Sequence, residues 1–127
     1  LEWLNYLQIS HPNIIQHAES DDGEFRIPNT KFSADGYCKE TNTVYEFHGD
    51  FWHGNPKLFN CNDTNTCTKT TYGELYEKTQ QKKYKIQELG YNYIEMWEYD
   101  WKKAIKAVIK IQRRWREKRY VNYNGKT

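Results

Sequence analysis

The sequence predicts an α/β fold in which a mixed central sheet is flanked by helices. Stretches with apolar residues at helical spacing alternate with β-branched and aromatic stretches, in the order helix, three strands, helix, strand, helix. A strand meander followed by a helical crossover to a fourth strand gives antiparallel and parallel neighbours in one sheet. The 127 residues suffice for one core, and the 17% of aromatic residues argues against disorder.

The N-terminal half is expected to form one helix and three strands. Leu1, Leu4 and Leu7 recur at helical spacing until the turn sequence HPN at 11–13. The turn sequence KETN at 39–42 joins the last two of the strands in a hairpin. The β-branched and aromatic stretches that predict the strands lie at 25–27, 31–38 and 43–48.

The C-terminal half is expected to form a loop, two helices and one strand. Residues 49–71 are poor in apolar side chains and predict a long loop, and long loops are often functional. Helical spacing over 72–89 ends at Gly90, a good C-terminal cap residue, and alternation over 91–97 predicts a strand. Helical spacing returns over 101–119.

Net charge divides the chain into an acidic body and a basic tail. Residues 1–101 carry nine Lys or Arg against sixteen Asp or Glu, whereas residues 102–127 carry ten against one. We therefore expect a core at 1–101 and a basic C-terminal helix and tail at 102–127, packed on the core or extending from it. This asymmetry suits an enzyme acting on nucleic acid, although solvated faces that happen to differ would produce the same counts.

Cysteine usage and hydropathy bear on the setting of the protein. Three cysteines at irregular spacing are too few for a disulfide framework, which favours a reducing intracellular setting, at the site of DNA. No apolar run approaches the roughly 18 residues of a membrane span, so we expect no membrane partner.

The segment EFHGDFWHG at 46–54 gathers an acid, two histidines and three large aromatic residues. Side chains alternate along a strand, so Glu46 and His48 share one face. Asp35 lies in the preceding strand of the hairpin, so Asp35 and Glu46 can reach one ion, and two carboxylates with water oxygens suit Mg²⁺ or Mn²⁺. His48 would stabilise charge beside the ion, and His53 would act as general base, because imidazole titrates near neutral pH.

Taken singly, these residues have ordinary structural explanations. Asp35 can form a turn, and Glu46 can be an exposed strand residue. His48 and His53 can be hydrogen-bonded packing residues. Taken together they favour a site, because two acids eleven residues apart, with a histidine two residues beyond the second, match a metal site built on two strands.

Three segments carry a family resemblance: ADGY at 34–37, VYEFHGDFWHG at 44–54 and KTQQKKYKIQELGYNYIEMWE at 78–98. They resemble the very-short-patch repair (Vsr-like) endonucleases, a branch of the PD-(D/E)XK nuclease superfamily, over roughly residues 1–101. The resemblance implies a restriction-endonuclease-like three-layer core of helix-strand-strand-strand-helix-strand order, followed here by the basic helix. It also implies a Mg²⁺-dependent deoxyribonuclease.

The resemblance implies roles for individual site residues. Asp35 resembles the metal-binding Asp of the family, and the backbone carbonyl of Phe47 occupies a position that also ligates metal there. His48 and His53 resemble the two catalytic histidines. Glu2, in the first helix, resembles the helical Glu that reaches the site in many superfamily members.

Other residues resemble family residues at the same positions, including residues that contact DNA in the family. Glu46 is acidic as in the superfamily pattern, with His48 where Lys usually stands. Phe51 and Trp52 resemble the aromatic residues that wedge between bases. Lys78, Lys82 and Lys83 are solvated charges by default, although superfamily members sometimes place a catalytic Lys or Gln on this helix. We include Lys78 among the residues expected to contact nucleic acid.

The chain departs from the family at a structural zinc site. The places of the zinc ligands hold Asp50, Asn55 and Tyr99, so we expect that zinc to be absent and do not transfer mismatch specificity. Cys61 and Cys67 are separated by five intervening residues with no second pair, which is a weak zinc pattern.

The tail sequence IQRRWREKRY at 111–120 lies outside the resemblance. It matches the first half of a calmodulin-type IQ motif and fails in the second half, so we expect no calmodulin-like partner. We expect Arg113, Arg114 and Arg116 to contact DNA phosphates. The alternative is a solvated helix.

The sequence therefore predicts a metal-dependent DNA endonuclease or nickase that hydrolyses a phosphodiester bond, in DNA repair or processing. Two alternatives stay open. One is a nuclease-derived DNA-binding module without catalysis, and the other is an interaction domain acting through the basic tail.

Overall fold

Residues 1–124, the part described by the computed structural model, confirm an α/β fold with helices and a mixed sheet. The helices in this range are α1 (Glu2–Ser10), α2 (Asp50–His53), α3 (Tyr72–Glu88) and α4 (Glu98–Asn124). The strands are β1 (Phe25–Arg26), β2 (Ser33–Ala34), β3 (Gly36–Cys38), β4 (Thr43–His48) and β5 (Asn92–Trp97).

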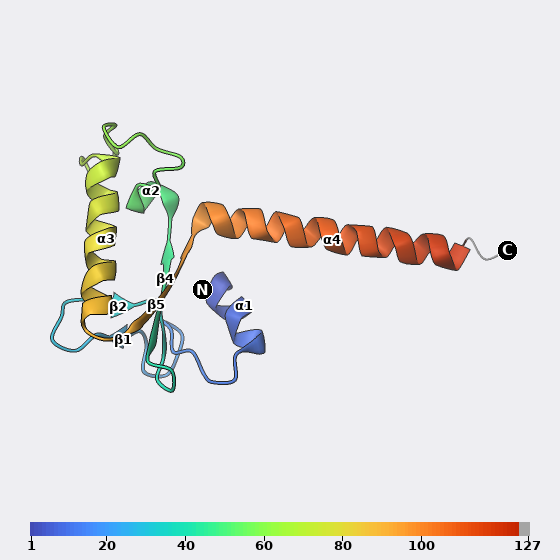
Figure 1. The fold of residues 1–127 in the computed structure, drawn as a ribbon, viewed down its shortest axis with the longest axis horizontal. Coiled ribbons are helices and arrows are strands. Elements are labelled where there is room, and N and C mark those ends of the chain that lie inside the picture. The colour runs from blue at the N-terminus through green and yellow to red at the C-terminus, as the bar shows by residue number, and fades with distance from the viewer. Residues whose placement is uncertain (125–127) are drawn as a thin grey trace.

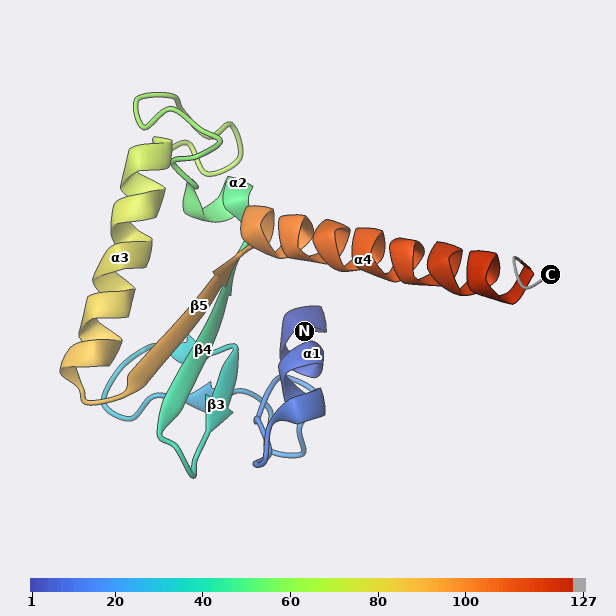
Figure 2. The same cartoon turned by 45° about the vertical axis from the view of Figure 1, so that its right-hand side comes forward.

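The central sheet has the order β3-β4-β5, with β4 in the middle (Figure 2). β3 and β4 are antiparallel, whereas β4 and β5 are parallel with Glu46 beside Glu95 and His48 beside Trp97. The crossover between β4 and β5 passes through α2 and α3, as a parallel pair requires. The sheet is therefore mixed, as predicted.

Helices cover both faces of this sheet, and β4 divides its side chains between them. Tyr45 packs with Trp3 and Leu4 of α1 in one core cluster. Val44 packs with Ile86 of α3 in a second cluster on the other face. Because side chains alternate along a strand, Glu46 and His48 share the face of Val44 and point toward α3.

The predicted strand at 31–38 is wrong as a single strand, because the chain bends at Asp35. β2 pairs with β1 in a separate two-stranded sheet, and β3 pairs with β4. The Asp35 carboxylate accepts the backbone N–H of Phe47 at 2.8 Å, a bond of the kind that strand pairing otherwise supplies. At Gly36, a Cβ would lie 2.8 Å from Leu4 Cδ2, so helix α1 comes close to the backbone at this bend.

The predicted loop at 49–71 begins with α2, which sequence patterning missed. Four residues are too few to show a helical period. Gly54 ends α2 with φ of 65°, a backbone conformation that favours glycine. A Cβ at this position would lie 2.2 Å from the Tyr72 carbonyl oxygen, so there is no space for a side chain either. His53 is thereby placed on a short helix beside α3.

Helix α3 closely follows the prediction for 72–89. Thr71 accepts the N–H of Glu74 at 3.1 Å, and the Glu74 carboxylate accepts the N–H of Thr71 at 3.1 Å, a reciprocal cap. Gly90, with φ of 97°, follows the last turn and leads into β5.

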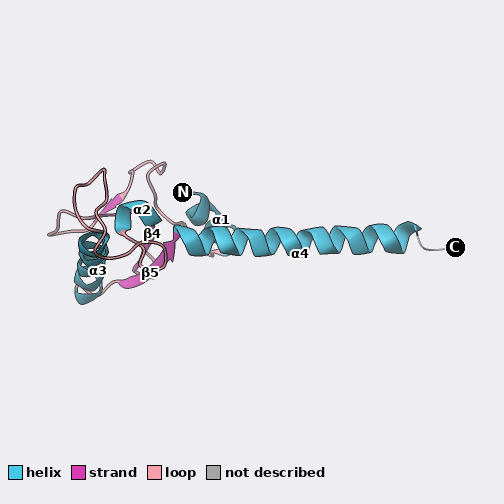
Figure 3. Ribbon diagram, turned by 90° about the horizontal axis from the view of Figure 1, so that it is seen from above, coloured by secondary structure: helices cyan, strands magenta, loops and turns pink. Residues whose placement is uncertain are grey.

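Helix α4 extends from the core and does not pack on it beyond its first turns (Figures 1 and 3). It follows β5 directly at Glu98, three residues before the predicted start at 101. Trp101 and Ile105 are half-buried, whereas residues 106–122 are exposed. Residues 125–127 of the predicted tail lie outside the described residues. None of the helices described is both long enough and apolar enough to cross a membrane.

Candidate metal and catalytic site

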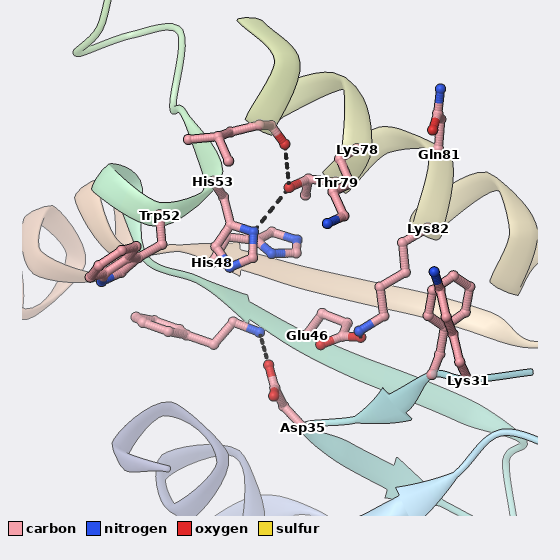
Figure 4. A pocket seen from close by; sticks show the side chains of 13 residues that line it. Lys31, Asp35, Glu46, His48, Trp52, His53, Lys78, Thr79, Gln81 and Lys82 are labelled. Carbon is pink, nitrogen blue, oxygen red and sulfur yellow. Dashed lines mark hydrogen bonds and ion pairs between the residues drawn. The ribbon is translucent and has the colours of Figure 1, made fainter. Parts of the chain in front are cut away.

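Most of the predicted site residues of the body converge on one cavity between β4 and α3. Its volume is about 470 Å³, and Figure 4 shows its lining. The predicted residues that line it are Asp35, Glu46, Phe47, His48, Trp52, His53 and Lys78.

The two predicted metal-binding carboxylates differ in what holds them. Asp35 lies at the bend between β2 and β3, and the Phe47 N–H fixes its orientation. Glu46 is 4% exposed, and its Oε1 lies 2.7 Å from Lys82 Nζ. That contact is an ion pair whose angles do not make a hydrogen bond, so this buried oxygen lacks an aligned donor.

The environment of Glu46 opposes its negative charge. Burial is the main cause that raises its pKa, to about 8, and the nearby Asp35 carboxylate adds to the effect. The ammonium of Lys82 lowers the pKa but does not outweigh burial. Two carboxylates that line one cavity, one of them buried without an aligned hydrogen-bond donor, are chemically suited to a divalent cation.

The donor set fits a hard ion that keeps several waters. In residues 1–124 no group of three or more His, Cys, Asp or Glu side chains is placed to share one ion. Mg²⁺ commonly binds through one or two carboxylates, with water and substrate phosphate completing its shell. Asp35 and Glu46 fit that requirement, and the Phe47 carbonyl as a third ligand stays a prediction.

Thr79 of α3 determines which nitrogen of His53 carries the proton. The Thr79 hydroxyl donates to the Leu75 carbonyl at 3.0 Å, so its single proton is committed. Its oxygen lies 2.9 Å from His53 Nδ1 and must therefore accept a proton from that nitrogen. Neutral His53 consequently has an unprotonated Nε2, the form that a general base needs.

His48 is held by a second network on the same face of the sheet. Its Nε2 lies 3.0 Å from Glu95 Oε2 and 3.2 Å from the Tyr93 hydroxyl. Lys83 of α3 contacts the other Glu95 oxygen at 2.9 Å. Because a carboxylate accepts and does not donate, Nε2 of His48 carries its proton toward Glu95.

Burial keeps both histidines neutral. It lowers the pKa of His53 to about 4, with nearby His48 as the next cause, so this imidazole does not titrate near neutral pH as the sequence led us to expect. Burial also lowers the pKa of His48, against the opposing effect of Glu95. The two ring centroids are 5.0 Å apart, so the site holds two neutral imidazoles beside two carboxylates.

Some predicted residues lie away from the cavity or turn from it. Glu2 is exposed at the start of α1 and lines neither this cavity nor the smaller one that Asp35 also borders. Phe51 packs against Phe59 and Tyr72, whereas Trp52 is 56% exposed at the cavity rim. The three predicted arginines, Arg113, Arg114 and Arg116, are exposed on the projecting part of α4.

Sequence reasoning missed Thr79, Glu95 and Lys31, which the fold brings to the site, and treated Lys82 as a solvated charge by default. Thr79 and Lys82 are three residues apart on α3, so they share a helix face, a signal that the sequence contains. Glu95 is placed by its parallel register beside Glu46, which no local pattern reveals. Lys31 lines the cavity from the loop before β2.

Comparison with family models, with curated proteins and with solved structures finds no significant match to this chain.

Proposed function

We propose that the protein is a metal-dependent DNA endonuclease or nickase that hydrolyses a phosphodiester bond. The observation that carries the proposal is the convergence of Asp35, Glu46 and a neutral His53 on one cavity. Lys31, Lys78 and Lys82 line the same cavity, so an anionic substrate would meet positive charge there.

The carboxylates and histidines divide the chemistry between them. Asp35 and Glu46 would hold Mg²⁺ or Mn²⁺, whose positive charge would polarise the phosphate and stabilise the transition state. His53 accepts the proton of the attacking water at Nε2, because Thr79 occupies Nδ1. When His48 gains a proton, Glu95 stabilises the resulting charge next to the phosphate.

The substrate side of the cavity is suited to a nucleic acid. Trp52 offers an exposed aromatic face at the rim, and base stacking on such a face adds about 1–3 kcal/mol per base. Lys31 and Lys78 offer ammonium groups to backbone phosphates. Phe51 is committed to its aromatic neighbours, so we assign the wedge to Trp52 alone.

Two further observations support a restriction-endonuclease-like fold related to the Vsr-like enzymes. The elements follow the implied order, with helices on both faces of a mixed sheet. In addition, the three positions that replace zinc ligands come together. Asp50 Oδ1 accepts the side-chain N–H of Asn55 at 2.8 Å and the backbone N–H of Tyr99 at 3.3 Å. Hydrogen bonds thus join the segments that zinc joins in the family.

A second candidate function is an interaction domain acting through α4. Ile111 and Trp115 lie on one side of this helix, Trp115 is 66% exposed, and no described residue of the body covers them. Deletion of the helix with retained DNA cleavage would count against this candidate.

A cleavage assay with an active-site variant tests the proposal. Supercoiled, linear, branched and mismatched DNA are incubated with the protein and Mg²⁺ or Mn²⁺, with chelator as control. We expect nicked or cut product from at least one substrate, and none from Asp35→Asn, whose side-chain oxygen still accepts the Phe47 N–H and so preserves the fold.

The matched control is Asp22→Asn, which neutralises an exposed acid outside the cavity and should cleave like wild type. Metal-dependent cleavage by folded Asp35→Asn at the wild-type rate would refute the assignment. DNA binding without cleavage of any substrate would instead favour the inactive DNA-binding module.

A further inference from the structure

The ammonium of Lys82 occupies a defined place between the sheet and α3. Its Nζ lies 2.7 Å from Glu46 Oε1 and donates to the Ser33 carbonyl at 3.1 Å. It also lies 5.5 Å from the centre of the Phe32 ring. Figure 4 shows the side chain reaching from α3 down to Glu46. These contacts hold a half-buried cation against the carboxylate that is expected to bind metal.

The next residue, Lys83, provides a comparison within the same helix. Its Nζ pairs with Glu95 at 2.9 Å and does not line the cavity. Both lysines are therefore ion-paired and similarly accessible, with side-chain exposures of 31% and 26%. They differ in that Lys82 alone contacts a carboxylate of the proposed metal site.

A divalent ion at Glu46 and the ammonium at its present place are incompatible. An ion held by Asp35 and Glu46 would lie close to the ammonium, because Lys82 Nζ is 2.7 Å from an oxygen of the same carboxylate. Two positive groups at one buried carboxylate repel each other. Lysine carries its charge on a flexible four-carbon stem, so the ammonium can turn away while its backbone stays in α3. The other cationic residues of the cavity, Lys31 and Lys78, mark where phosphate would lie.

We propose that Lys82 is an internal counter-ion that a divalent metal displaces, and that the released ammonium then contacts the substrate phosphate. This inference rests on the proposed function, because it requires metal binding at Asp35 and Glu46. It makes Lys82 a catalytic residue that exchanges a carboxylate for a phosphate oxygen. In the metal-free protein, the Glu46 carboxylate and the Lys82 ammonium are counter-charges for each other.

Amine labelling tests the displacement directly. The wild-type protein is treated with a small amine-reactive reagent with and without saturating Mg²⁺, and labelling at each lysine is followed by mass spectrometry. We expect the rate at Lys82 to rise at least fivefold with Mg²⁺ and the rate at Lys83 to stay constant. Asp35→Asn should abolish the rise. Adding a short DNA duplex with Ca²⁺ in place of Mg²⁺ should protect Lys82 again.

Calorimetric titration of Mg²⁺ into the same protein separates the possible failures. Metal binding with unchanged labelling at Lys82 would overturn the displacement and leave the proposed nuclease intact. An absence of Mg²⁺ and Mn²⁺ binding at millimolar concentration would overturn both. Equal rises at Lys82 and Lys83 would also overturn the inference, because they would indicate general loosening of α3.

A substitution tests the substrate contact. Lys82→Met should retain metal binding and lower the cleavage rate at saturating metal and DNA by about 100-fold or more. Lys85→Met, on the exposed side of α3, is the matched control and should leave the rate unchanged. A folded Lys82→Met protein with a wild-type rate would show that Lys82 is only a structural tether of Glu46 and Ser33.

Discussion

Thr79 shows how one hydroxyl can set the chemistry of a neighbouring residue. Because its proton is committed to the Leu75 carbonyl, it forces the proton of His53 onto Nδ1. Thr79→Val keeps the shape of the side chain and removes this acceptor. We expect the cleavage rate to fall roughly tenfold or more, since the histidine loses its preferred tautomer.

Thr79→Ser is the conservative control, because its hydroxyl can make both contacts and should restore most of the rate. A purely structural role would instead lower stability in Thr79→Val without changing the rate of the folded fraction. Measuring single-turnover cleavage and thermal unfolding on both variants distinguishes the two roles.

The lowered pKa of His53 predicts a pH dependence of stability. Its folded-state pKa of about 4 lies below the value of about 6.5 expected in the unfolded chain. Unfolded protein therefore binds more protons between these values, so the contribution of His53 is complete above about pH 6.5 and is lost as pH falls toward 4.

Comparing wild type with His53→Asn isolates this contribution, because other titrating groups are common to both. The free-energy difference measured by denaturant unfolding should change by about 2 kcal/mol between pH 7 and pH 4, allowing for solvent screening. A difference that is constant over this range would contradict the lowered pKa.

The helices and strands that local sequence patterns determine were predicted close to their observed ranges. β4 and α3 lie close to the predicted ranges because the β-branched and aromatic stretch at 43–48 and the helical spacing over 72–89 are local signals. The break at Asp35 was missed because the bond from the Phe47 N–H is a tertiary contact. α2 was missed because a four-residue helix has no period to detect.

The same distinction applies to the candidate site. The hairpin alone predicts that three of the site residues lie close together, since its turn sets the pairing of the two strands. These residues are Asp35, Glu46 and His48. His53 was correctly placed near them without knowledge of α2. Glu95 and Lys82 could not be placed, because their positions depend on the register of β5 and the angle of α3, which no short segment encodes.

We expect the projecting part of α4 to contribute little to the stability of the core. Residues 108–122 are exposed, so deleting the chain from Val108 onward should remove few contacts with the core. We expect the free energy of unfolding to change by no more than about 0.5 kcal/mol. Denaturant unfolding of the truncated chain, read from tryptophan fluorescence of the body, provides the measurement.

Trp101→Ala is the contrasting variant, because this ring lies 5.5 Å from Tyr6 and packs on the core cluster of α1. Trp101→Ala should lower the free energy of unfolding by about 2 kcal/mol, less than the same substitution at a fully buried tryptophan. A large loss of stability on deleting 108–127 would mean that the helix folds back on the body in solution.

The whole molecule separates its charges in space as well as in sequence. The acidic body carries the cavity, and the basic helix α4 projects away from it (Figure 1). An acidic surface repels DNA at long range, so in the proposed nuclease we expect the helix to draw a duplex toward the cavity. Binding and chemistry should therefore respond to different substitutions.

Neutralising Arg113, Arg114 and Arg116 together tests this division. If these exposed side chains contact phosphates, binding should weaken alike for all DNA sequences, and the slope of log affinity against log salt should flatten by about 0.9 for each lost contact. Cleavage at saturating DNA should stay near the wild-type rate, because no arginine of α4 lines the cavity. A salt titration of wild type and the triple variant, with Asp35→Asn added to both to prevent cleavage, gives the slopes. Identical slopes would exclude phosphate contacts by these arginines and leave the lysines of the cavity as the principal attraction for DNA.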